Sequence, residues 1–332
     1  MINKSKYFSF KLIASICFML GSSILALWLG AANTSLHDVW LSITTSLESE
    51  TLTMLREIRL PRIIAALFVG AALAVSGTIM QGVTRNPLAD PGLLGVTAGA
   101  NVALAITVAF FPSANYFTIM IACFIGASLG TLLVVGIGSV QKGGFSPLKI
   151  VLAGAAVSAF LYAIADGIGI YFKISKDVSM WTAGGMIGTN WNQLKMVVPC
   201  ILISVIISLF LSRQLSLLSL NEDVATGLGQ NILIIKAILF LLISILAGAA
   251  VALVGNLAFV GLMVPHIVRA IIGADYNKIL PLSVFIGATF MVLADLAGRT
   301  INAPFETPVA AIVAIMGLPF FLIIVRRGGK AF

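Results

Sequence analysis

Long apolar stretches follow one another along most of the chain, separated by short polar segments. Eight of them run about 17–25 residues with few or no charges, the length that an α-helix needs to cross the hydrocarbon core of a bilayer. Two further stretches, 91–111 and 256–272, are apolar but interrupted by Gly or Pro. The eight uninterrupted stretches are 10–30, 63–82, 117–140, 148–172, 196–212, 232–254, 279–297 and 308–325. The pattern predicts an all-α integral membrane protein with about ten transmembrane helices.

The composition supports this prediction. Of 332 residues, 60% are hydrophobic and only 10% are charged, whereas a soluble domain carries roughly 25% charged residues. So few charges cannot cover a water-soluble globule of this size, so most of the surface faces lipid. We therefore expect residues 1–332 to form a single transmembrane domain.

The distribution of basic residues predicts the orientation. With ten crossings both chain ends lie on the same side, and most of the 20 Lys and Arg residues fall on that side. The positive-inside rule then places both termini in the cytoplasm. The net charge of +8 is explained by orientation and lipid contact, and we expect no nucleic-acid partner.

No polar segment is long enough to bind and hydrolyse a nucleotide, and no phosphate-cradling GxxxxGK[ST] loop occurs in the sequence. Uphill transport would therefore draw its energy from an ion gradient or from a partner protein. No HExxH or GxSxG motif supports a membrane enzyme.

The segment after the second apolar stretch combines close packing with a broken backbone. Gly70, Ala74 and Gly77 let another helix approach closely. Pro87 and Pro91 then force the chain to leave one helix and begin another. Non-helical backbone at membrane depth survives only where it is buried in protein or lines a wet cavity. This segment is either an ordinary interhelical turn or a gate at the mouth of a pathway.

Three polar residues lie within apolar stretches, where an unpaired charge is costly. Asp295 and Arg299 are four residues apart, which permits an ion pair on one helix face. Asp166 either faces a central pathway or bonds a neighbouring helix. His266 is interpreted as structural or interfacial, with a proton-relay role as the alternative.

The cytoplasmic segment 217–229 has the pattern of a short capped helix. Ser219 or Asn221 can cap its start, acids occupy its first turn, and Gly227 or Gly229 can end it. Such a helix suits docking into a groove of another protein, although a solvated connector has the same pattern.

Several motifs together resemble one family. They are RLPR at 59–62, GAALAVSG at 70–77, MQGVTRNPLADPGLLGV at 80–96, FVGLMVPHIVR at 259–269, and ADLAGR with the following PFETPVA at 294–310. In these stretches, which span nearly the whole chain, the sequence is similar to the FecCD-type permease subunits of ABC importers for ferric siderophores, haem and cobalamin.

The resemblance implies a multi-pass protein of the bacterial cytoplasmic membrane that is a transport subunit and not an enzyme. It implies a second permease subunit (a similar but distinct chain is favoured over a homodimer), two ATPase subunits carrying ATP and Mg, and an external substrate-binding protein. The substrate would be a ferric chelate, with a ferric siderophore favoured over cobalamin, and this chain would hold no cofactor or metal of its own. The alternative is a proton-coupled secondary transporter using Asp166, Asp295 or His266 as relay groups.

The resemblance also assigns roles to particular positions. Residues 178–190, which include Trp181, match a short outer gating helix. The binding protein would dock on Arg59, Arg62 and Arg299, although contact with lipid headgroups would also explain these arginines. The cytoplasmic gate would contain Asn86, Leu88, Pro147 and Leu148. The segment that docks into the ATPase would contain Ser219, Asn221, Glu222, Asp223, Ala225, Gly227, Leu228 and Gly229.

Overall fold

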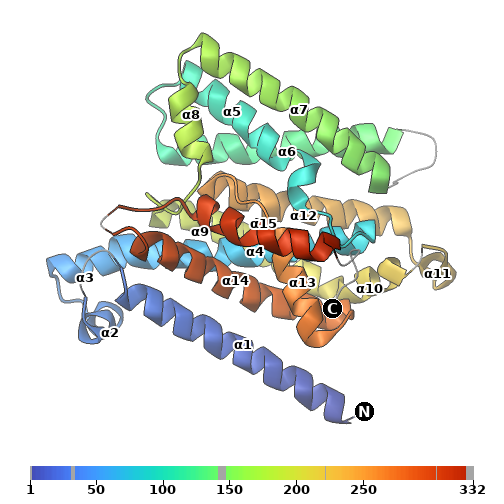
Figure 1. Cartoon of the computed structure of the whole chain (residues 1–332), viewed down its shortest axis with the longest axis horizontal. Coiled ribbons are helices and arrows are strands. Elements are labelled where there is room, and N and C mark those ends of the chain that lie inside the picture. The colour runs from blue at the N-terminus through green and yellow to red at the C-terminus, as the bar shows by residue number, and fades with distance from the viewer. Residues whose placement is uncertain (1, 31–33, 141–146, 221, 304, 327–332) are drawn as a thin grey trace.

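The computed structural model describes every residue except 1, 31–33, 141–146, 221, 304 and 327–332, and it leaves out the side chains of 2–5, 139–140, 147–148 and 325 (Figure 1). In the described part, all regular secondary structure is helical. The helices are α1 (Ile2–Trp28), α2 (Leu36–Thr44), α3 (Glu50–Met54), the π-helical turn η1 (Leu55–Arg59), α4 (Leu60–Thr84), the 3-10 turn η2 (Pro91–Leu94), α5 (Val96–Phe110), α6 (Tyr116–Val140), α7 (Pro147–Tyr171), α8 (Ser175–Thr182), α9 (Trp191–Phe210), α10 (Ser212–Leu220), α11 (Glu222–Gly227), α12 (Ile232–Val254), α13 (Val260–Ile272), α14 (Tyr276–Thr300) and α15 (Val309–Arg326).

Each of the ten predicted apolar stretches coincides with a helix. In the described residues, seven helical segments are long and apolar enough to cross a membrane. One is the continuous helix Glu50–Thr84, which comprises α3, η1 and α4, and the other six are α1, α6, α7, α9, α12 and α14. The other three, α5, α13 and α15, are shorter apolar helices. The predicted all-α, multi-span fold is therefore confirmed.

Helix α4 lies at the centre and packs against α9, α12, α13 and α14 (Figure 1). Glycines bring its backbone close to two of these neighbours. A Cβ atom on Gly70 would lie 2.2 Å from the Gly287 carbonyl oxygen of α14, and one on Gly77 would lie 1.8 Å from the Gly261 oxygen of α13. Small residues at such crossings let helices pack in lipid, where the hydrophobic effect does not drive them together. The predicted packing face of this stretch is thus real.

A second group of helices, α5, α6 and α7, lies on one side of this centre, and α1 lies on the opposite side (Figure 1). Gly99 of α5 and Gly126 of α6 again meet too closely for a side chain, since a Cβ atom on Gly99 would be 2.1 Å from the Gly126 oxygen. In the most apolar part of α1, only 17% of the residues are buried against the rest of the chain. Most of this helix is therefore free to face lipid.

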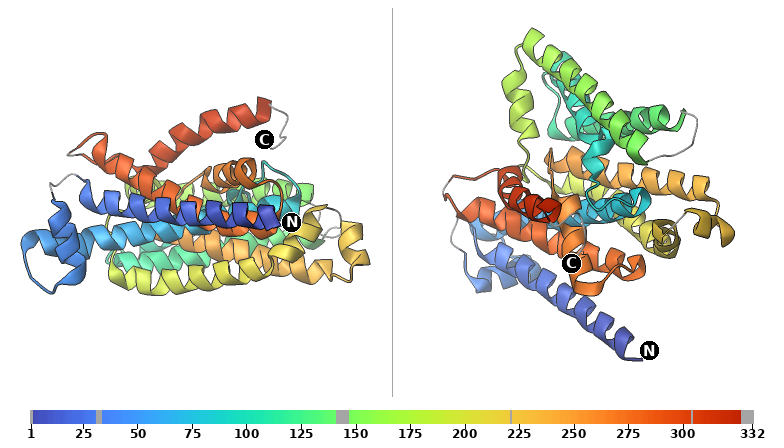
Figure 2. Two further views of the ribbon diagram at one scale, coloured as in Figure 1. Left: turned by 90° about the horizontal axis from the view of Figure 1, so that it is seen from below. Right: turned by 45° about the vertical axis from the view of Figure 1, so that its right-hand side comes forward.

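The short helices gather at the two ends of the bundle. Figures 1 and 2 show α10 and α11 at the end where α1 begins and α15 ends, and α2, α3 and α8 at the opposite end. This arrangement agrees with the predicted topology, in which segment 217–229 and both ends of the chain lie on the same side of the membrane.

Candidate functional site

The loop that joins α4 to α5 is held in shape by its own polar side chains. Arg85 ends α4 in the left-handed conformation, with φ of 51°. The Asn86 side-chain oxygen then accepts from the Leu88 amide at 2.9 Å. Asp90 caps η2 by accepting from the Gly92 amide at 2.8 Å. Each side-chain oxygen thus accepts from the amide of the residue after a proline, where the prolines interrupt the helices.

Two of the predicted gate residues follow the end of α4, and the other two are at the start of α7. On the α4–α5 loop, Asn86 is exposed and Leu88 is half-buried. Pro147 and Leu148 are the first two residues of α7, and the structure does not describe their side chains. A gate formed by these four residues stays a prediction.

The predicted docking segment 217–229 covers the end of α10 and the whole of α11, and Asn221 lies outside the described residues. Ser219 does not cap a helix start: its hydroxyl donates to the Ser216 carbonyl within α10 at 2.7 Å. The helix continues this far because Leu215 and Leu218, one turn apart, are buried against the bundle. The prediction for segment 217–229 did not use this spacing.

The second half of the segment follows the predicted pattern. Glu222 and Asp223 occupy the first turn of α11, Ala225 is buried, and the chain turns at Gly229 with φ of +82°. Leu220, Val224 and Leu228 leave large apolar side chains exposed, at 72%, 47% and 62%. Exposed apolar groups on and beside α11, at this end of the bundle, form a surface that a partner protein can cover.

Glu222 connects this segment to two long helices. Its Oε1 lies 2.9 Å from Nη2 of Arg85 at the end of α4, and its Oε2 lies 2.9 Å from Nζ of Lys236 on α12. Lys236 is buried, so its ammonium gains more from a paired carboxylate than an exposed group would. A displacement of α11 would therefore pull on the residue that precedes the predicted gate position Asn86.

Helix α10 is held to α14 by polar contacts at the same end. The Ser212 hydroxyl donates to the Asn277 side-chain oxygen at 3.0 Å, and Asp275 caps the start of α14. Burial alone would raise the pKa of the Asp275 carboxyl, but hydrogen bonds from Asn277 and the nearby Lys278 ammonium hold this pKa below its ordinary value. Asp275 therefore stays ionised as a cap at neutral pH.

A network of buried charges closes the opposite end of the bundle. Arg62 Nε lies 2.9 and 3.1 Å from the two carboxylate oxygens of Asp295, and Arg62 Nη1 lies 2.8 Å from Oε1 of Glu306. Arg299 Nε lies 3.1 Å from Asp295 Oδ2, which confirms the predicted Asp295–Arg299 pair. The pairing of Arg62 with Asp295 and Glu306 was not predicted, because no sequence spacing indicates contacts across more than 230 positions.

The three arginines assigned to docking are buried within the chain, at 5% exposure for Arg59, 7% for Arg62 and 4% for Arg299. Arg59 Nη1 donates to the Leu27 carbonyl at 2.7 Å and to the Thr34 hydroxyl at 2.9 Å. These contacts hold the end of α1 against the start of α4. Docking of a binding protein on these arginines stays a prediction, and the structure shows that each already has partners in its own chain.

The break between α12 and α13 is tied to the outer segment. Gly255 adopts φ of 76°, and the Gly185 amide donates to the Val254 carbonyl at 2.9 Å. The Asn256 amide donates to the Thr182 carbonyl at 3.4 Å. The predicted outer helix 178–190 is helical only as far as Thr182, because glycines with positive φ follow it. Its role as a gate stays a prediction.

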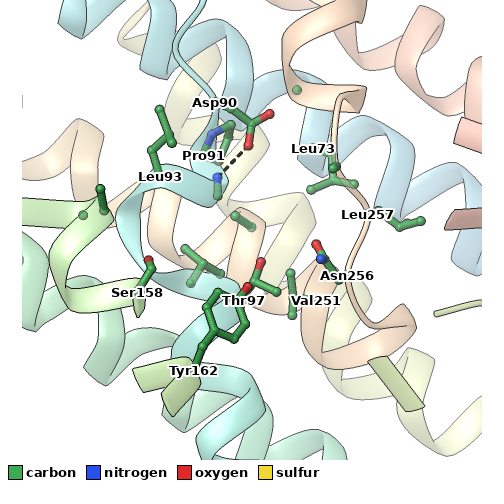
Figure 3. A pocket seen from close by; sticks show the side chains of 17 residues that line it. Leu73, Asp90, Pro91, Leu93, Thr97, Ser158, Tyr162, Val251, Asn256 and Leu257 are labelled. Carbon is green, nitrogen blue, oxygen red and sulfur yellow. Dashed lines mark hydrogen bonds between the residues drawn. The ribbon is translucent and has the colours of Figure 1, made fainter. Parts of the chain in front are cut away.

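A cavity of about 220 Å³ lies between α7 and this break (Figure 3). Its polar lining consists of Asp90, Thr97, Ser158, Tyr162 and Asn256, contributed by the α4–α5 loop, α5, α7 and the α12–α13 break. The cavity is thus lined by non-helical backbone and polar side chains, and it lies among apolar helices. Water-lined cavities within membrane proteins have this composition.

The remaining intramembrane polar residues differ in their surroundings. His266 is buried at 1% exposure, and its Nδ1 lies 2.9 Å from the Leu262 carbonyl oxygen, so its ring is part of the packing of α13. Asp166 is exposed on α7. Among the described residues, no group of three His, Cys, Asp or Glu side chains is arranged to hold a metal ion.

The fold and site together define the membrane-spanning subunit of a transporter: broken helices line a polar cavity, and a short helix pair presents apolar side chains at one end. A family model described as the FecCD transport family matches residues 17–327. The chain therefore belongs to the FecCD transport family, as a permease component of an ABC transporter.

Relatives and a solved structure match nearly the whole chain. The iron(3+)-hydroxamate import system permease protein FhuB of Bacillus subtilis is 43% identical, over 95% of this chain and 83% of that protein. The hemin transport system permease protein HmuU of Yersinia pestis is 38% identical, over 96% of this chain and 94% of that protein. A structure described as an inward-facing conformation of a metal-chelate type ABC transporter has a TM-score of 0.84 at 28% identity, and covers 95% of this chain and 98% of that one.

Proposed function

We propose that this chain is the permease subunit of an ABC importer that carries a ferric siderophore across the bacterial cytoplasmic membrane. The observation that carries the proposal is the match of residues 17–327 to the FecCD transport family. Relatives named as permeases for iron(3+)-hydroxamate, Fe(3+)-citrate and ferric enterobactin support a ferric chelate as the substrate. In this proposal two permease subunits form the pathway between them, and they are a similar but distinct pair.

The energy would come from two ATPase subunits on the cytoplasmic side, which bind ATP and Mg. Their groove would receive α10 and α11, whose exposed Val224 and Leu228 give a partner apolar surface to bury. Nucleotide-driven closure of the ATPases would then move α11, and Glu222 would pass this movement to Arg85 and to the gate positions Asn86 and Leu88 on the same loop.

An external binding protein would deliver the chelate at the opposite end, near Arg59, Arg62 and Arg299. Since Arg62 and Arg299 are buried and paired with acids of this chain, a carboxylate of the binding protein would compete with one of these acids. The best candidate for displacement is Glu306, whose side chain is 32% exposed, whereas that of Asp295 is 1% exposed.

Substitution of the proposed docking face tests the function. In Val224→Glu/Leu228→Glu, two charges would have to enter the partner's apolar groove, so we expect the ATPase subunit to be lost on co-purification from membranes. The control is Leu47→Glu, which changes an exposed leucine at the opposite end and should leave the ATPase bound. Full retention of the ATPase by the double variant would rule out this docking surface.

A further inference from the structure

One face of α7 becomes polar toward its outer end. Ala155, Ser158 and Tyr162 line the cavity of Figure 3. Asp166 follows Tyr162 by four residues, about one helical turn. Residues at this spacing share a helix face. Asp166 therefore extends the cavity-lining face of α7 by one turn toward the outer end.

Packing within the chain does not account for this acid. Asp166 lies inside the apolar span Lys149–Tyr171 and is exposed. In the part of the chain that the structure describes, no hydrogen bond or ion pair engages its carboxylate. A charge facing hydrocarbon is strongly unfavourable, and such residues in membrane proteins face a bundle interior or a water-filled path. Among the described residues, the predicted bond from Asp166 to a neighbouring helix is not present. We therefore argue from the other predicted location of this acid, the substrate pathway.

The sign of the charge along this face is uniform. Among the described residues that line the cavity, Asp90 is the charged one, and no Lys, Arg or His contributes. The basic residues that follow α7, Lys173 and Lys176, are exposed beyond its outer end. A chelate that has left the mouth and moves along α7 therefore meets carboxylate and neutral polar groups. In a confined, partly dehydrated space such a wall repels anions more strongly than it would in bulk water.

We propose that Asp166 makes the pathway selective for ferric chelates of neutral or positive net charge, the class formed by hydroxamate siderophores. A full set of hydroxamate groups just balances the charge of ferric iron, and any additional amine makes the complex cationic. Catecholates and hydroxycarboxylates bring surplus negative charge and leave an anionic complex. This inference rests on the proposed function, because it assumes that the cavity face of α7 borders the substrate path.

The test is uptake of radioactive iron by the complete transporter, in cells that lack other siderophore importers. The probes are a neutral trihydroxamate, a cationic trihydroxamate and a polyanionic tricatecholate ferric complex. We expect uptake of a hydroxamate complex by the unchanged transporter. Asp166→Lys should lower uptake of the cationic complex about tenfold or more, because like charges repel in a confined path. Asp166→Asn should lower it by a smaller factor, and should affect the neutral complex less than the cationic one.

A matched charge reversal, Glu48→Lys, alters an exposed acid of the α2–α3 loop and should leave uptake unchanged. Basal ATP hydrolysis by the purified complex shows whether each variant assembles, and if Asp166→Lys does not, Asp166→Asn decides. Uptake of the polyanionic complex alone, or equal transport by the Asp166 variants and Glu48→Lys, would overturn this inference while leaving the importer function intact. No uptake of any ferric chelate would instead overturn the proposed function.

Discussion

Arg62 and Asp295 are 233 residues apart in the chain, yet Nε of Arg62 lies within hydrogen-bonding distance of both carboxylate oxygens of Asp295, at 2.9 and 3.1 Å. The pair joins the start of α4 to the outer end of α14, and Glu306 and Arg299 complete the network. Both side chains are nearly inaccessible to solvent. Removal of one of them therefore leaves the other as a buried charge that has lost this counter-charge.

The first prediction concerns this network. Asp295→Ala should destabilise the protein by about 3–5 kcal/mol, the usual effect of breaking a buried ion pair. The double variant Arg62→Met/Asp295→Ala should recover part of the loss, since it also removes the Arg62 charge, and recovery should be incomplete because Arg299 has lost the same carboxylate. Thermal unfolding of the purified protein in detergent measures the effect, with Asp177→Asn on the exposed surface of α8 as the control. Equal melting temperatures for Asp295→Ala and the control would show that the network adds nothing to stability.

The sequence predicted features that depend on local spacing. Apolar length predicted all ten helical stretches, and the interval of four residues predicted the Asp295–Arg299 pair. Contacts between distant segments, such as Glu222 with Arg85, carry no such signal. They depend on the tertiary arrangement of helices, which hydrophobic periodicity does not encode.

Two local predictions were inaccurate for identifiable reasons. Ser219 was expected, as one of two alternatives, to cap a short helix, but buried leucines extend α10 to Leu220 and place Ser219 inside it. The outer segment was expected to be helical over 178–190, but positive φ angles at its glycines end the helix at Thr182. In both cases the position of one helix end decided the outcome, and helix ends depend on tertiary packing as well as on sequence.

A second prediction tests the glycine contacts of α4. Gly77→Ala would place a Cβ atom 1.8 Å from the Gly261 oxygen, so α4 and α13 would have to separate. We expect a loss of about 1–3 kcal/mol, as in other overpacked cores. Gly21→Ala on α1, where nothing lies within 4 Å of the added atom, should be neutral or stabilising by about 0.5–1 kcal/mol. Detergent melting curves compare the two, and a Gly77→Ala protein as stable as Gly21→Ala would contradict the packing described here.

A third prediction concerns the connection between α11 and α4. Arg85→Gln removes one arm of the Glu222 contact and leaves the buried Lys236 pair in place, so the fold should persist. An exposed ion pair contributes about 0.2–1 kcal/mol, and we therefore expect iron uptake per ATP hydrolysed to fall roughly two- to fivefold. Parallel assays of ATP hydrolysis and uptake measure this ratio. Arg213→Gln, which removes an exposed cytoplasmic charge, should not change it, and the idea fails if both variants behave alike.

A fourth prediction concerns docking at the outer end. Glu306→Gln removes the more exposed carboxylate paired with Arg62 and should strengthen binding of the substrate-binding protein by about two- to fivefold, as for one exposed pair. Glu57→Gln removes another exposed acid at this end and serves as the control for overall charge. Surface plasmon resonance with the permease complex in nanodiscs gives both affinities. Weaker binding by Glu306→Gln than by Glu57→Gln would show that Glu306 does not compete with the binding protein.

The central claim is that the work of transport reaches this chain from a partner that hydrolyses ATP. The most direct measurement is iron accumulation in proteoliposomes that contain the permease and its ATPase, with binding protein and ferric siderophore outside. The account predicts that accumulation requires ATP in the lumen and persists when the proton gradient is abolished. Accumulation driven by a proton gradient in vesicles that contain the permease without the ATPase would contradict it.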